Sequence, residues 1–167
     1  MNFEGKKIIL RAIEEEDLTL LHKWSNDPQT QNIMGAIHLP SSIDFHKKWF
    51  NNLIEDKLNI RFAIDAPNIG LIGLSSIMKI DWKNSHAWHG VMLGNVDIRG
   101  KGFGYDAVMT TMKYAFDELN FNRLDGPNIY HFYNNTFFFS LLFSILIFHN
   151  KNQLILYYIQ SLNHLIY

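Results

Sequence analysis

The sequence predicts a mixed α/β domain, an α+β fold around a mixed sheet, over residues 1–126. Segments with strand and helix patterns alternate through this part of the chain, which favours the mixed class. Three consecutive strand candidates are separated only by turn-length connectors, which indicates antiparallel neighbours. Residues 127–167 differ sharply in composition, so the C-terminal part of the fold is expected to be atypical or incomplete.

A strand and a helix are expected first. The stretch KIILRAI at 7–13 is β-branched and compact enough for the strand, and the acidic residues at 14–17 suit the positive end of a helix dipole. One face of this helix carries Leu18, Leu21 and Trp24. Asp27-Pro28 is expected to end it, because proline cannot continue a helix.

A second helix is expected over 44–57, with a cap at Ser42 or Asp44. Apolar side chains recur along it at helical spacing. They are Phe45, Trp49, Phe50, Leu53 and Ile54. Both helices are interpreted as structural elements.

Three strands, a helix and a last strand follow. The strands are expected at 60–65, 69–80 and 86–94, separated by the turn-rich pieces APN and DWKNS. Apolar residues at helical spacing predict a helix over 105–119. The stretch NRLDG at 122–126 is expected to form a strand that this helix crossover reaches.

Composition limits the classes of function. With 167 residues, 47% of them hydrophobic, the chain is most simply one domain with one core. A formal charge of -1 gives no reason to expect a nucleic acid partner. The chain has no cysteine, which excludes disulfides, thiolate metal sites and a cysteine nucleophile and fits a cytoplasmic location. The N-terminal apolar run is too short for a signal peptide.

The stretch DIRGKGFGYDA at 97–107 contains three glycines and two cations between Arg99 and Gly104. Glycine lets backbone N–H groups approach a ligand closely, and the first turn of a following helix offers unpaired donors at its positive end. The stretch therefore predicts a cradle for an anion such as phosphate. Arg99 and Lys101 add positive charge at its rim.

Two other phosphate motifs compete for these residues. A Walker loop requires Ser or Thr after Gly-Lys, but Gly102 follows Gly100-Lys101, which excludes it. A dinucleotide fingerprint is matched by Gly102, Gly104 and Ala107. Asp125 lies roughly 20 residues beyond it, as that motif requires. However, the residues NVDIR separate the loop from the preceding strand, and antiparallel strands oppose a dinucleotide-binding domain.

The pattern Arg99-x-x-Gly102-x-Gly104, between a strand and a helix, resembles the (Gln/Arg)-x-x-Gly-x-(Gly/Ala) loop of the GNAT superfamily of N-acetyltransferases. Four segments of the chain also resemble, in the same order, segments of the ribosomal-protein-alanine and small-amine acetyltransferase branch of that superfamily. They are ILRAIEEEDLTLLHKWSNDPQ, IGLIGLSSIMKID, AWHGVMLG and GKGFGYDAVMTTMKYAFDELNFNRLDG. The resemblance covers nearly all of residues 6–126 and implies a GNAT acyl-CoA N-acyltransferase fold.

This resemblance implies acetyl-CoA as co-substrate and no metal. The loop and the helix start would bind the pyrophosphate, and backbone groups of the preceding strand would pair with the pantetheine arm. The residues implied are Met92, Leu93, Gly94, Arg99, Gly100, Lys101, Gly102, Phe103, Gly104 and Tyr105. The thioester would point into a gap between that strand and the strand at 122–126.

The resemblance also implies direct attack of a neutral amine on the thioester, without a protein nucleophile. The protein must supply proximity, a donor for the developing oxyanion and a route for the ammonium proton. A backbone N–H near Met92 or Leu93 is the oxyanion candidate. Similar enzymes often carry a glutamate where this chain has Trp88, so the adjacent His89 is the catalytic candidate and water the alternative.

Two further clusters have ordinary structural interpretations. A metal at His86, His89 and Asp97 is disfavoured, because histidines three apart on a strand face opposite sides. The aromatic candidates for an acceptor pocket are Trp24, His38, Trp49 and Trp82. Aromatic side chains at helix and turn positions more often form core or rim packing.

The composition changes abruptly near Gly126. Residues 127–167 hold one charged residue, Lys151, whereas all 16 acidic residues and 14 of the 15 basic residues precede them. Residues encoded by A/T-rich codons dominate this tail, which favours an altered reading frame. The alternatives are strand-prone runs that fill part of the core and a membrane-seeking end. The run FFFSLLFSILIF at 137–148 is shorter than the ~20 residues that span a bilayer.

The sequence thus predicts a transferase that moves an acetyl group from acetyl-CoA to a primary amine. The acceptor stays open between a protein N-terminus, a polyamine, an aminosugar and an antibiotic amine. The tail, without the family's closing helix and strands, would leave a sheet edge exposed beside 122–126. A catalytically impaired derivative, coenzyme-binding only or non-functional, is therefore the second hypothesis. No nucleic acid partner is expected, a membrane partner is disfavoured, and a homodimer is compatible with the sequence.

Overall fold

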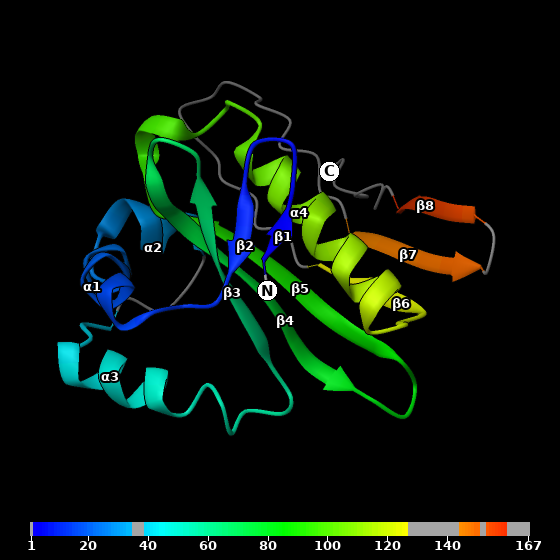
Figure 1. The fold of residues 1–167 in the computed structure, drawn as a ribbon, viewed down its shortest axis with the longest axis horizontal. Coiled ribbons are helices and arrows are strands. Elements are labelled where there is room, and N and C mark those ends of the chain that lie inside the picture. The colour runs from blue at the N-terminus through cyan, green and yellow to red at the C-terminus, as the bar shows by residue number, and fades with distance from the viewer. Residues whose placement is uncertain (1, 35–38, 127–143, 151–152, 160–167) are drawn as a thin grey trace, which may run out of the picture.

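The computed structural model describes residues 2–34, 39–126, 144–150 and 153–159. Its strands form one mixed sheet in the order of the chain, which confirms the predicted class (Figure 1). The strands are β1 (Phe3–Glu4), β2 (Ile9–Arg11), β3 (Ile60–Ala66), β4 (Gly70–Asp81), β5 (His86–Leu93), β6 (Arg123–Asp125), β7 (Ser144–Asn150) and β8 (Gln153–Ile159). Strands β5 and β6 are parallel, and the other neighbouring pairs are antiparallel.

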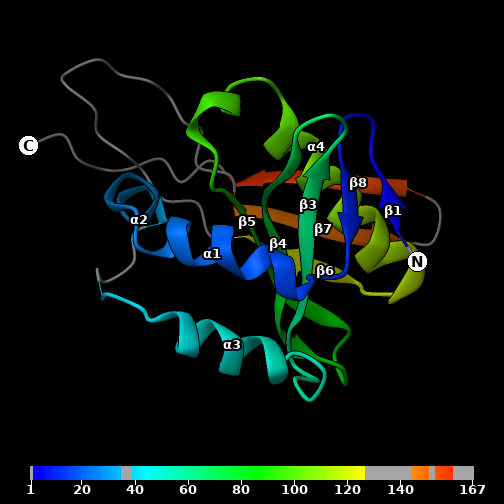
Figure 2. The ribbon, with the colours of Figure 1, turned by 60° about the vertical axis from the view of Figure 1, so that its left-hand side comes forward.

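Helices cover both faces of this sheet (Figure 2). They are α1 (Leu18–Ser25), α2 (Pro28–Met34), α3 (Ile43–Asn51) and α4 (Phe103–Lys113), with short 3-10 turns at Glu15–Asp17 and Val96–Ile98 and a π-helical turn at Tyr114–Glu118. The predicted antiparallel meander β3-β4-β5 and the predicted helix crossover to a strand within 122–126 are both confirmed, and the structure adds that β6 lies parallel to β5.

The core is split between the two faces. On one face, Leu21 and Trp24 of α1 pack on Ala63 of β3, together with partly buried residues of α3. On the other face, α4 covers the sheet through Ala107 and Met112. Because side chains alternate along a strand, each central strand contributes to both clusters.

The helical boundaries differ from the predictions at two places. Pro28 ends α1 as expected, but it also begins α2, where its fixed φ and missing N–H suit the first helical position. The Asp27 side chain accepts hydrogen bonds from the N–H of Thr30 at 2.8 Å and from its hydroxyl at 2.7 Å, which stabilises that start. Helix α3, capped by Ser42, ends at Asn51 rather than at residue 57.

The pairing of β5 with β6 is short. It covers only His86 with Arg123, Ala87 with Leu124, and Trp88 with Asp125. Beyond Trp88, strand β5 continues to Leu93 while β6 ends. Within the described residues, the β5 edge from 89 to 93 that faces away from β4 has no strand partner.

The expected exposed edge beside 122–126 is wrong. Strand β7 pairs with β6 through Phe148 to Arg123 and Ile147 to Leu124, and β8 pairs with β7. This hairpin supplies the backbone partners that the edge of β6 requires. The apolar run 137–148 lies partly in β7, and its residues before 144 lie outside the described residues. In the parts of the chain that the structure describes, no helix is long and apolar enough to cross a membrane.

Candidate functional site

The chain between β5 and α4 contains the glycine loop, which we define as residues 99–104. Gly100 and Gly102 have φ angles of 75° and 86°, in the left-handed region that favours glycine. A β-carbon on Gly100 would meet no other described atom within 4 Å, so the loop faces open space there. The backbone of the loop is therefore exposed on its outer side.

The first turn of α4 presents backbone donors beside this loop. Gly102 precedes the helix, and no side chain among the described residues caps it. The N–H of Asp106 donates to the Gly102 carbonyl at 3.1 Å, so the N–H groups of residues 103–105 have no acceptor inside the helix. Together with the positive end of the helix dipole, these groups fit an anion. Tyr105 is 73% exposed, which leaves this turn accessible.

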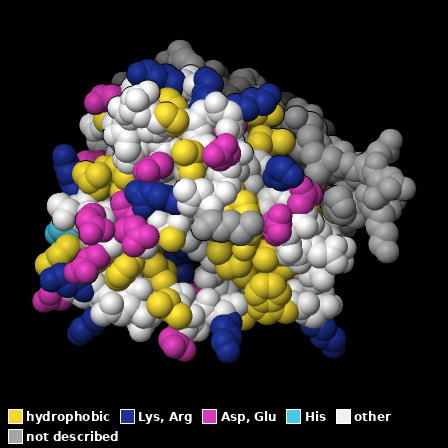
Figure 3. Space-filling view, viewed as in Figure 1, with side chains coloured by type: hydrophobic (Ala, Val, Ile, Leu, Met, Phe, Trp, Pro, Cys, Tyr) yellow, Lys and Arg dark blue, Asp and Glu magenta, His cyan; other side chains and the backbone are white. Residues whose placement is uncertain are grey.

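Positive charge surrounds the loop. Arg99 Nη2 donates to the Leu93 carbonyl at 3.0 Å, which fastens the loop to the end of β5, and Lys101 is exposed. Figure 3 shows Lys and Arg side chains along the upper rim of the molecule, where Figure 1 places the loop and the turn between β1 and β2. Sequence reasoning missed Lys7, which also reaches the loop, because 94 positions separate it from Lys101.

The end of β5 leads directly into the loop. Met92 packs with the cluster under α1 and α3, whereas Leu93 packs with the cluster under α4. On one edge their backbones pair with Leu74 and Gly73 of β4. The other edge is the stretch of β5 beyond Trp88 that has no strand partner among the described residues. An extended ligand chain would find backbone groups there.

His89 follows Trp88, the last residue of β5 that pairs with β6. It is buried, and its Nδ1 has no hydrogen-bond partner in the described part of the chain. Burial lowers the pKa of His89 below its ordinary value, partly opposed by the charge of Asp125, so the ring is neutral at pH 7. The ring lies against Gly126 and leaves no room there for a β-carbon. Trp88 is half-exposed on the opposite face of the strand.

The aromatic candidates for an acceptor pocket that the structure describes, Trp24, Trp49 and Trp82, do not line a common pocket. Trp24 is buried in the core, where its ring covers the α-carbon of Gly94. Trp82 is exposed and packs on Phe121, and His38 lies outside the described residues. Trp49 borders a surface hollow of ≈ 290 Å³. The other residues lining it are Asn52, Leu53, Glu55, Asp56 and Arg61.

No group of three or more acidic or histidine side chains within the described ranges is arranged to hold a metal ion. His86 and His89 belong to β5, and Asp97 lies in the 3-10 turn after that strand. The glycine loop presents backbone amides and the cationic side chains of Arg99 and Lys101.

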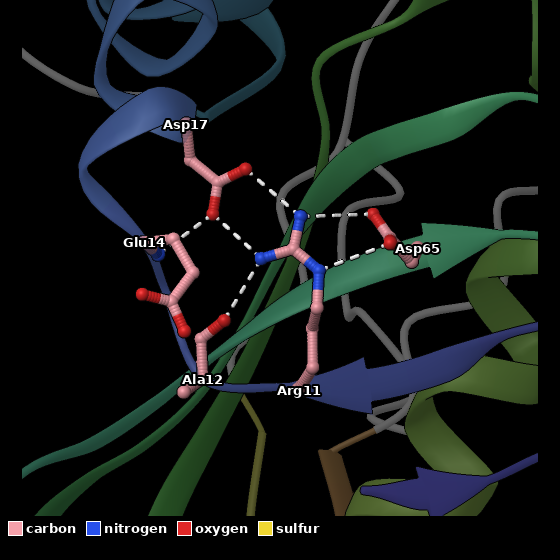
Figure 4. Close-up of polar contacts among 5 residues, drawn as sticks. All are labelled: Arg11, Ala12, Glu14, Asp17 and Asp65. Carbon is pink, nitrogen blue, oxygen red and sulfur yellow. Dashed lines mark hydrogen bonds and ion pairs between the residues drawn. The ribbon is translucent and has the colours of Figure 1, made fainter.

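A second polar cluster holds α1 on the sheet (Figure 4). The Arg11 guanidinium donates to both oxygens of Asp17, at 2.7 and 2.8 Å, and to both oxygens of Asp65, at 3.1 and 3.0 Å. Burial raises the pKa of Asp17, but the hydrogen bonds from Arg11 and from the N–H of Glu14 outweigh it, so the pKa is lowered overall. This cluster lies on the scaffold rather than at the glycine loop.

Comparisons with known proteins identify the family and agree with the fold. A family model described as the acetyltransferase (GNAT) domain matches residues 7–127. Spermidine N(1)-acetyltransferase of Vibrio cholerae is 26% identical, over 77% of this chain and 77% of its own. The uncharacterized N-acetyltransferase YokL of Bacillus subtilis is 28% identical, over 78% of this chain and 71% of its own. A crystal structure of the V. cholerae enzyme with CoA and spermine shares the fold, with a TM-score of 0.67 at 24% identity, over 73% of this chain and 71% of that one.

Proposed function

We propose, from the premise that this chain belongs to the GNAT acetyltransferase family, that its acceptor is a small polyamine rather than the N-terminus of a protein. Family membership establishes the reaction class, which is acetyl transfer from acetyl-CoA to an amine. The choice of acceptor rests on the V. cholerae relative, whose name specifies spermidine. The predicted ribosomal-protein-alanine branch stays the alternative.

The glycine loop and the first turn of α4 are proposed to hold the pyrophosphate of the coenzyme. The observation that carries this assignment is the uncapped start of α4 beside two glycines of positive φ. The residues assigned are Arg99, Gly100, Lys101, Gly102, Phe103, Gly104 and Tyr105. Backbone groups of Met92, Leu93 and Gly94, next to the unpaired edge of β5, are proposed to receive the pantetheine arm.

The bound coenzyme supplies an acetyl thioester, and the protein's residues align and protect the reacting groups. A backbone N–H near Met92 or Leu93 is proposed to stabilise the oxyanion, since such donors act strongly where water is excluded. The acceptor must lose a proton. His89 is the proposed base, because burial keeps its imidazole neutral and because it lies directly beyond the last residue of β5 that pairs with β6.

Replacing His89 with glutamine tests the base assignment. If His89 accepts the proton, kcat/KM falls by about 100-fold or more in H89Q. The wild-type profile should be flat at pH 6.5 and above and should fall only at lower pH, because burial lowers the pKa of His89 below its ordinary value of 6.5. The matched control is H86Q, which alters a half-buried histidine of the same strand and should keep the wild-type profile. An unchanged profile in H89Q would assign the proton to water.

Thiol release from acetyl-CoA tests the function itself. Purified protein is expected to release free thiol with spermidine at a higher kcat/KM than with a peptide that begins with alanine. A preference for the peptide would overturn the acceptor assignment. The impaired derivative stays the second hypothesis, because Trp88 stands where similar enzymes often carry a glutamate. Thermal stabilisation by acetyl-CoA without thiol release from either amine would favour it.

Assembly, location and the domain boundary at residue 126 stay predictions. The V. cholerae relative has a dodecameric structure, which supports self-association of this chain, and the predicted homodimer is one form of it. The predicted cytoplasmic location rests on the lack of cysteine. An altered reading frame after Gly126 is checked by resequencing the gene at that codon.

A further inference from the structure

We infer that Lys7 is a positioning residue of the coenzyme-phosphate site. It orients a peptide group of the glycine loop and adds a positive charge beside it. The inference rests on the proposed function of the glycine loop. Lys7 Nζ donates to the Lys101 carbonyl at 2.8 Å, across the gap between the β1–β2 turn and the loop. The same ammonium would lie 3.3 Å from a β-carbon on Gly102 and is 6.0 Å from the centre of the Phe103 ring.

The hydrogen bond fixes the direction of one peptide group. In a trans peptide the carbonyl and the following N–H point to opposite sides. Because Lys7 holds the Lys101 carbonyl on its own side, the N–H of Gly102 must point away from Lys7. A glycine-rich loop lacks side chains that would impose this orientation. Lys7 therefore preorganises a donor at the start of α4.

The scaffold holds the backbone of Lys7 in place. The buried Asp106 carboxylate, in the first turn of α4, accepts hydrogen bonds from the N–H of Lys7 at 2.6 Å and from the N–H of Ile8 at 3.2 Å. At Gly5, a β-carbon would lie 2.5 Å from Asp106 and 2.6 Å from Thr110, so the β1–β2 turn fits closely on the helix. The stem of Lys7 therefore starts from a fixed point beside the loop.

The charge of Lys7 is available to a ligand. The side chain is exposed, and within the described residues its ammonium forms no ion pair. The Asp106 carboxylate, which contacts the backbone of Lys7, accepts hydrogen bonds from backbone N–H groups. An uncompensated cation beside a helix N-terminus strengthens the attraction for a diphosphate. Lys7 thus contributes positive charge from a segment far from the glycine motif.

Calorimetric titration with CoA tests this inference in the K7A variant, with K6A as the matched control. Lys6 is the adjacent exposed lysine, and it forms no hydrogen bond or ion pair among the described residues. CoA should bind K7A about tenfold more weakly than wild type. The Gly102 N–H would no longer be held ready to donate to the charged diphosphate, and a hydrogen bond to a charged group contributes roughly 1.5 kcal/mol. K6A should stay within about twofold of wild type, and K7R should restore most of the lost affinity.

Salt dependence separates a role at the phosphates from a structural role. The affinity of wild type for CoA should fall more steeply with KCl than that of K7A, and KM for acetyl-CoA should rise in K7A while kcat is kept. Equal CoA affinity in K7A and wild type overturns the inference. Failure of wild type itself to bind CoA overturns the proposed function of the loop instead. If K7A melts early, K7Q replaces it in the same titration.

Discussion

Replacing Gly104 with aspartate is expected to weaken CoA binding by at least about 100-fold while the protein stays folded. Gly104 lies in the first turn of α4, where a carboxylate interacts favourably with the helix dipole, so the melting temperature should be kept or slightly raised. The same carboxylate would occupy the space in front of the free N–H groups and repel phosphate. Stability and ligand affinity should therefore change in opposite directions. Calorimetric titration and thermal melting measure the two effects.

Two variants control for this result. N51D adds the same charge at an exposed position at the end of α3 and should leave CoA affinity unchanged. G104A places a β-carbon 3.5 Å from Leu93, an ordinary contact, and should raise stability by about 0.5–1 kcal/mol through better helix propensity. CoA affinity in G104D equal to that of wild type would contradict the loop assignment.

Replacing Arg11 with alanine is expected to lower the free energy of unfolding by about 3 kcal/mol, because it leaves the buried Asp17 carboxylate and the partly exposed Asp65 carboxylate without their cation. The unpaired charge of Asp17 is expected to account for most of this loss in stability, since its side chain is only 7% exposed. The Arg11 cluster also joins the start of α1 to β2 and β3, so its loss loosens the face that carries Trp24. Chemical denaturation at pH 7 measures the effect.

Acid should reduce the difference between wild type and R11A. The pKa of Asp17 is lowered in the folded state, so the stabilisation is complete above the ordinary aspartate pKa, about 3.9, and is lost as pH falls through the lowered value. K113A, which removes an exposed ion pair with Asp117 on the α4 side, should match wild type. A free energy of unfolding in R11A within about 1 kcal/mol of wild type would show that the cluster adds little.

Local patterns predicted much of the fold. The meander β3-β4-β5 followed from short turns between β-branched runs, and α4 followed from apolar residues at helical spacing. The missed helix α2 begins at Pro28, which the sequence presents equally as a stop and as a first helical residue. Helix α3 ends early at Asn51, because two asparagines interrupt a face that continues apolar to Ile54. Strand β1 is only two residues long and carries no periodicity.

Part of the candidate site could likewise be predicted from local sequence patterns, and part could not. The glycine loop could be predicted because its glycines and the helix start are contiguous in the chain. The contacts of Lys7 and Arg11 could not, since the sheet brings together residues that are 94 and 54 positions apart. The burial of His89 and its position beside Gly126 depend on which residues of β5 and β6 lie opposite each other. The sequence does not predict the register of this parallel pair.

A titration of ¹⁵N-labelled protein with CoA, followed through the backbone amide resonances, examines whether the start of α4 binds a diphosphate. The largest shifts should occur at Gly102, Phe103, Gly104 and Tyr105, with smaller ones along β5 near Met92 and Leu93. Saturating shifts confined to another region, such as the hollow beside Trp49, with the glycine loop unchanged, would contradict the assignment.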